Sequence, residues 1–120
     1  MRMNIIKGKP FQADFVVKAN GSTTALVLDP KDTGTITFFT IGNNPETTLE
    51  KNLLLTNTEM GTFTLYLTSE ETALFDTRIG FGEDSFPVIP TYKAALEFKT
   101  LSQGHMSALI DQVYIVDMGL

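Results

Sequence analysis

The stretch that most constrains the fold is 61–75, which reads GTFTLYLTSEETALF. In its first half apolar and polar residues alternate, so that Phe63, Leu65 and Leu67 leave one side of the backbone. The residues between them, Thr64 included, leave the other side. Because successive side chains of a pleated strand point to opposite faces, the alternation predicts a strand with one buried face.

The residues that follow this strand predict a helical turn. The segment 68–71, Thr-Ser-Glu-Glu, has the S/T-x-x-E pattern of a capping box. In such a box the first hydroxyl accepts from the backbone N–H three residues later, and the glutamate reaches back to the first N–H. We therefore expect a short helical turn near Ser69–Phe75, with Ala73 and Leu74 covering the core.

Two other segments show the same alternation, one near each end of the chain. They span 11–17 and 92–99 and are bounded by turn-forming residues such as the Asn-Gly pair at 20–21. The residues predicted to face inward are Phe11, Ala13, Phe15 and Val17 in the first and Tyr92, Ala94, Leu96 and Phe98 in the second.

Three further regions are less uniform. Thr35–Ile41 is rich in β-branched and aromatic residues and predicts a strand, although either of its faces can be the inner one. Thr47–Thr56 fits a helical turn or a strand, and we favour a strand over Asn52–Thr56. Met106–Met118 changes phase around 111–112, which predicts either a bulge or two strands with a bend.

About seven short strands separated by turns are typical of a β-sandwich. One sheet cannot bury all the inward faces, so two packed sheets are the simplest architecture. We therefore predict an all-β, immunoglobulin-like antiparallel β-sandwich that forms a single domain over 1–120. The disulfide and core tryptophan of true immunoglobulin domains are absent, because the chain has no cysteine and no tryptophan.

Composition excludes several classes of partner. The formal net charge of -5 disfavours nucleic acid, because an acidic surface repels phosphates. The sequence has no run of ~20 apolar residues that would span a membrane. It also lacks an N-terminal apolar run of the ~7–15 residues that a signal peptide needs, so we expect synthesis in a cytoplasm without export by that route.

The sequence offers little for catalysis, metal binding or a cofactor. His105 is the only histidine and lies in a predicted turn, and no G-x-S-x-G motif supplies a serine nucleophile. The acidic pairs at 29 and 32 and at 83–84 lack the ligand spacing of an EF-hand. The glycine-rich segment 80–85 lacks the lysine and third glycine of a phosphate-binding loop. We expect no catalytic residues, no cofactor and no metal.

Exposed apolar residues are the remaining candidates for function. If Phe38 faces the core, Phe39 faces outward, and Phe81 and Phe86 lie in the loop-like segment 76–90. Together with Val16 on an outward face, these residues are candidates for protein contact, since exposed aromatic clusters mark interfaces. The alternative is that the loop folds back and its rings cap the sandwich.

The order of features resembles a known family. It includes a Lys-Pro-Phe start at 9–11, an Asn-Gly hairpin at 20–21, an Asp-Pro turn at 29–30 and above all the stretch 61–75. The chain resembles small immunoglobulin-like domains of tailed-bacteriophage structural proteins, particularly the N-terminal domain of phage baseplate upper proteins. It departs from them in the segment 29–34 and in lacking their long C-terminal extension, so we expect a free-standing version of the domain.

The resemblance implies a non-enzymatic virion protein of the tail, baseplate or head-tail region. Its partners would be itself, as a homo-oligomer, and other virion proteins, and it would be made in the host cytoplasm. Self-association is also suggested by the apolar run 113–116 near the C-terminus. The alternatives are a carbohydrate- or receptor-binding module using Tyr66 or Tyr114, and a small hydrolase using the acidic residues Glu83 and Asp84.

Overall fold

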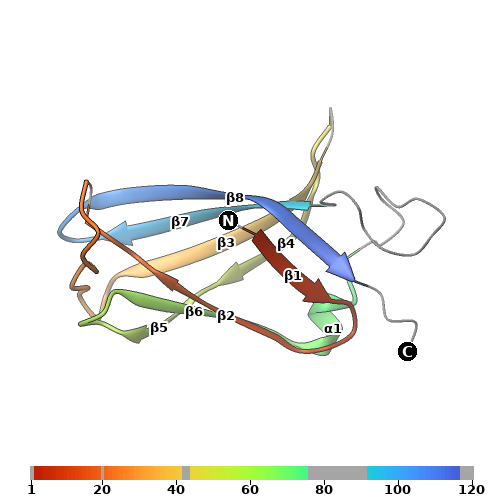
Figure 1. Cartoon of the computed structure of the whole chain (residues 1–120), viewed down its shortest axis with the longest axis horizontal. Helices are drawn as coiled ribbons and strands as arrows, with labels where there is room; N and C mark the ends of the chain where they lie inside the picture. Colours follow the sequence, from red (N-terminus) through yellow and green to blue (C-terminus); the bar gives the residue numbers. More distant parts are fainter. Residues whose placement is uncertain (1, 20, 42–43, 76–91, 117–120) are drawn as a thin grey trace.

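A computed structural model describes residues 2–19, 21–41, 44–75 and 92–116. These residues form two β-sheets packed face to face, with one helical turn at an end of the sandwich (Figure 1). In chain order the elements are β1 (Arg2–Ile6), β2 (Phe11–Val16), β3 (Thr33–Thr40), β4 (Thr47–Asn52), β5 (Leu54–Asn57), β6 (Thr62–Leu67), α1 (Ser69–Thr72), β7 (Tyr92–Thr100) and β8 (Gly104–Val116). The predicted all-β sandwich with a short helical turn is confirmed.

The strand order is that of an immunoglobulin-like domain. The large sheet runs β1-β8-β7-β3-β4 and the small sheet β2-β6-β5. Immunoglobulin sandwiches place strands B, E and D in one sheet and G, F, C and C′ in the other, which is the order found here. Within these sheets β1 pairs in parallel with β8, and the other strand pairs are antiparallel.

The core lies between the sheets and is built from the inward faces that alternation predicts. The inward residues of β6 and β7 are all buried, and those of β2 are buried or partly buried against the core. Aromatic rings join the two layers: the ring of Phe63 on β6 lies 5.2 Å from that of Phe98 on β7, centroid to centroid. Phe75, which follows α1, makes edge contacts with Phe38 and Tyr92 of the large sheet at 5.1 and 5.0 Å. Such contacts add to the stabilisation that burial provides.

The capping box forms as predicted, but the residues that cover the core differ from the prediction. Glu71 N–H donates to the Thr68 hydroxyl and Thr68 N–H donates to the Glu71 carboxylate. Thr72 and Phe75 are fully buried, whereas Leu74 is 59% exposed. The Thr72 hydroxyl accepts from Gly8 N–H and donates to the Lys9 carbonyl oxygen at 2.9 Å. The buried side of α1 is therefore the side of Thr72, which contacts the β1–β2 connection.

The ambiguous segment 47–56 is not one strand. It forms β4 in the large sheet and β5 in the small sheet, and the chain changes sheets at Leu53. Leu53 is buried, and its N–H donates to the Gly34 carbonyl oxygen at 2.8 Å. The prediction of a strand over Asn52–Thr56 was therefore right in type but missed the division, because the side-chain alternation continues through the change of sheet.

The phase change in the last strand is a bulge. Tyr92 pairs with Val113 and Ala94 with Ile110, so β8 has one extra residue at this point. A bulge lets a strand of mixed phase keep its apolar residues inside. Val113 and Ile115 are consequently buried, so these two residues of the run 113–116 fill the core and do not form the expected apolar surface, whereas Tyr114 and Val116 are half-buried.

Candidate functional site

Three connections meet at one end of the sandwich, which we call the hairpin end. It comprises 17–19 and 21–32 between β2 and β3, 58–61 between β5 and β6, and 101–103 between β7 and β8 (Figure 1, left). Leu28 N–H donates to the Thr58 carbonyl oxygen at 2.8 Å, which joins the first connection to the second. The short apolar run 25–28 is thus part of a connection held by backbone hydrogen bonds, and it contributes an isolated β-bridge at Ala25 rather than a strand.

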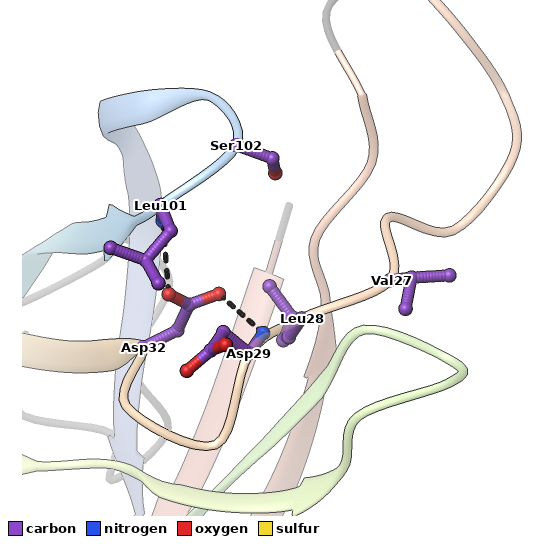
Figure 2. A pocket seen from close by; sticks show the side chains of 6 residues that line it. All are labelled: Val27, Leu28, Asp29, Asp32, Leu101 and Ser102. Atoms are coloured by element: carbon purple, nitrogen blue, oxygen red, sulfur yellow. Dashed lines mark hydrogen bonds between the residues drawn. The ribbon is translucent and has the colours of Figure 1, made fainter.

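Asp32 joins the first connection to the β7–β8 hairpin. Its buried carboxylate accepts from Asp29 N–H through Oδ2 at 2.8 Å and from Leu101 N–H through Oδ1 at 3.0 Å (Figure 2). The tight turn over 29–32 is closed by Asp32 N–H donating to the Asp29 carbonyl oxygen at 2.9 Å. Both carboxylate oxygens serve the backbone, so Asp32 fixes the position of the hairpin.

A pocket of about 370 Å³ opens beside this carboxylate. It is lined by Val27, Leu28, Asp29, Asp32, Leu101 and Ser102 (Figure 2). Val27 and Leu101 are 67% and 73% exposed, so the rim of the pocket is apolar and open to water. The Asp29 carboxylate accepts from Lys31 N–H through Oδ1, and both Asp32 oxygens accept backbone N–H groups, so the exposed lining is mainly apolar apart from the Ser102 hydroxyl. This chemistry suits binding through apolar contact.

The residues predicted for protein contact do not meet in one place. Val16 lies on the outer face of the small sheet and is half-exposed. Phe39 lies on the outer face of the large sheet beside Lys93 and is half-buried. Their outward orientation is as predicted, but they face opposite sides of the sandwich. Phe81 and Phe86 lie outside the described residues, as does the acidic pair at 83–84.

The outer face of the small sheet contains a polar network that the sequence did not indicate. Thr64 is only 3% exposed although it points away from the core. Its hydroxyl donates to Asp14 Oδ1 at 2.7 Å and lies 2.9 Å from the Thr56 hydroxyl, so the network crosses all three strands. Leu54 and Tyr66 stay exposed on this sheet. The exposed Tyr66 is consistent with the predicted alternation, whereas Tyr114 is half-buried under Arg2.

An ion pair joins the large sheet to α1. Lys51 Nζ lies 2.6 Å from each carboxylate oxygen of Glu71, and both side chains are partly buried. The hydrogen bond from Lys51, with that from the Thr68 backbone, lowers the pKa of Glu71 below its ordinary value. The pair fixes α1, the turn that follows β6 of the small sheet, to β4 at the border of the large sheet.

Within the part of the chain that the structure describes, the other titratable groups lack the arrangement of a metal centre. His105 is exposed at the start of β8, 3.7 Å from the Glu97 carboxylate. Among the described residues, no three metal-ligating side chains cluster together. Within the same ranges, no helix is long and apolar enough to cross a membrane.

No protein-family model matches the sequence. A search of curated proteins also returns no significant match.

Proposed function

We propose that this chain is a non-enzymatic module that acts by binding other proteins. The observation that carries the proposal is the hairpin end, where exposed apolar side chains surround a carboxylate whose two oxygens are held by backbone N–H groups. This carboxylate serves to hold the backbone of two connections, while the exposed Val27 and Leu101 gain from being covered. The outer faces of both sheets add further apolar residues.

Within this class we propose a structural or assembly protein of a tailed-bacteriophage virion. The resemblance of the stretch 61–75 and of the surrounding order of turns supports this particular role. The immunoglobulin-like strand order is compatible with it, since the resemblance implies that fold. The partners are other virion proteins and further copies of the chain.

The proposal is tested by locating the protein in purified particles. Quantitative mass spectrometry of virions from the encoding phage is expected to detect the chain at a fixed ratio to the major tail proteins. Its absence from particles that retain their other tail proteins would overturn the virion role.

The binding surface is tested separately by substitution. We expect the double variant Val27→Ser/Leu101→Ser to fold normally and to be depleted from particles by at least tenfold. Leu74→Ser is the matched control, because Leu74 is 59% exposed but lies in α1's C-terminal flank, away from the hairpin end. Equal incorporation of the double variant and the control would exclude the hairpin end as the contact.

The two rival functions predict different results. A carbohydrate-binding module would give specific hits on a glycan array that Tyr66→Ala abolishes, since Tyr66 is an exposed aromatic residue of the small sheet. A hydrolase would give turnover that Asp84→Asn or Glu83→Gln removes. Either result would contradict the proposed structural role.

A further inference from the structure

Strand β8 has an edge that is only half paired. Strand β1 begins at Arg2, opposite Gln112, and pairs with β8 from there to Val116. From Gly104 to Ile110, β8 pairs with β7 on one side and with no described strand on the other. Figure 1 shows this half of β8 running beyond β1 along the border of the large sheet.

Side-chain exposure agrees with an open edge. Ser107 and Ala108 are exposed, and Leu109 is 54% exposed. Ala108 pairs with the buried Leu96 on β7 and has the parity of an inward residue, yet it is exposed. Water therefore reaches the sandwich from this side.

This edge lacks the features that prevent pairing with another chain. Proteins usually block free edges with charged residues, proline, bulges or very short strands. The segment 104–110, GHMSALI, contains no proline, aspartate, glutamate, lysine or arginine. The other border strands of the two sheets are each protected: β1 carries Arg2, β2 carries Asp14, β4 carries Glu50 and Lys51, and β5 has four residues and a register shift.

We propose that the segment 104–110 pairs antiparallel with the same segment of a second copy of the chain, joining two large sheets into one. A second copy fits because a two-fold axis perpendicular to the sheet brings identical, uncharged segments together. The unpaired backbone N–H groups of each copy then donate to the unpaired carbonyl oxygens of the other, giving about one hydrogen bond per paired residue. This inference does not depend on whether the protein belongs to a virion.

The symmetry restricts the register. An axis perpendicular to the sheet keeps the outward residues of one copy beside outward residues of the other. It must therefore pass midway between the two copies of one residue, which is then paired with itself. Ser107 and Ala108 are the residues nearest the middle of the open edge. In either register the exposed Leu109 is covered by the partner's His105 or the partner's Ser107, both on the outer face.

Cysteine cross-linking tests this arrangement in a chain that has no cysteine of its own. Directly opposed residues of an antiparallel pair have Cα atoms ~4.5–5.5 Å apart, within the ~4.4–6.8 Å range of disulfides. We therefore expect Ala108→Cys or Ser107→Cys to form a covalent dimer under mild oxidation. Thr23→Cys, exposed in the β2–β3 connection, is the matched control. Dimer yields at both edge positions no higher than the control would overturn the proposal.

A charge placed on the edge gives an independent test without oxidation. We expect the wild-type chain to sediment as a dimer at ~100 µM, well above the micromolar constants of weak specific contacts. Ala108→Lys should be monomeric with an unchanged circular dichroism spectrum and should unfold at the temperature of wild type diluted to a monomer, and Thr23→Lys should remain dimeric. A strictly monomeric wild type, or a dimer that Ala108→Lys leaves intact, would refute pairing through β8.

Discussion

The bond between Asp32 and the β7–β8 hairpin gives the sharpest test of how the hairpin end is held. Asp32→Ala removes the acceptor for two backbone N–H groups, those of Asp29 and Leu101. A hydrogen bond to a charged group contributes ~1.5–3 kcal/mol, so the two bonds set an upper range of ~3–6 kcal/mol. The adjacent pocket is open, and water can reach the freed N–H groups. We therefore expect a loss near the lower end, ~3 kcal/mol.

The assay is equilibrium unfolding in urea, followed by circular dichroism and by tyrosine fluorescence. With a slope of ~1.5 kcal/mol/M for a domain of this size, a loss of ~3 kcal/mol lowers the midpoint by ~2 M. Asp32→Asn retains one acceptor oxygen, so its free energy of unfolding should fall by about half as much. Asp29→Ala is the control: among the described residues the Asp29 side chain accepts a hydrogen bond from the exposed Lys31 N–H alone, so its loss should cost under ~1 kcal/mol.

Two results would refute this reasoning. A loss below ~1 kcal/mol for Asp32→Ala would mean that the buried carboxylate costs as much in desolvation as its two bonds return. Equal losses for Asp32→Ala and Asp29→Ala would mean that the bond to Leu101, which crosses between connections, contributes nothing beyond the local turn.

Three further predictions concern the rest of the sandwich. The folded-state pKa of Glu71 is lowered, chiefly by the hydrogen bond from Lys51, so its ionised carboxylate stabilises the fold fully above the ordinary pKa of 4.5. This stabilisation is lost as the pH falls through the folded pKa. The difference in unfolding free energy between wild type and Glu71→Gln should therefore narrow as the pH is lowered below about 4.5. Gly61→Ala should destabilise by ~3 kcal/mol or more in urea, since φ is 59° and a Cβ would lie 2.5 Å from a backbone oxygen, whereas Gly21→Ala, with φ of 73° and open space, should cost only ~1–2 kcal/mol. Thr72→Val should cost ~1–3 kcal/mol by thermal unfolding and Thr72→Ser much less, because the buried hydroxyl bonds the β1–β2 connection and serine retains it; equal losses for the two would assign the effect to packing.

The alternating strands could be predicted because each has one buried face. Residues 63, 65 and 67 are inward in the structure for the reason that the sequence suggests, a period of two against a single core. The phase change in β8 could also be predicted, and of the two alternatives, a bulge or two strands with a bend, the structure has the bulge. Both features depend on one strand and its own core face.

The features that could not be predicted depend on neighbouring strands. Thr64 has the parity of an exposed residue, and only the strand order places Asp14 and Thr56 beside it. The change of sheet at Leu53 leaves no mark on the local pattern, because inward residues continue at every second position. Likewise the Asp32 carboxylate meets a backbone N–H 69 positions away, which no local motif indicates.

The two proposed surfaces lie on the same β7–β8 hairpin, and their geometry makes them compatible. The edge segment 104–110 begins where the turn 101–103 ends, so antiparallel pairing of two edges directs the two hairpin turns in opposite directions. Neither turn then covers the other copy's pocket. One edge is thus sufficient to pair two copies, while the exposed Val27 and Leu101 of each copy stay available to a different protein. A dimer of this kind would present two copies of the pocket, related by the two-fold axis.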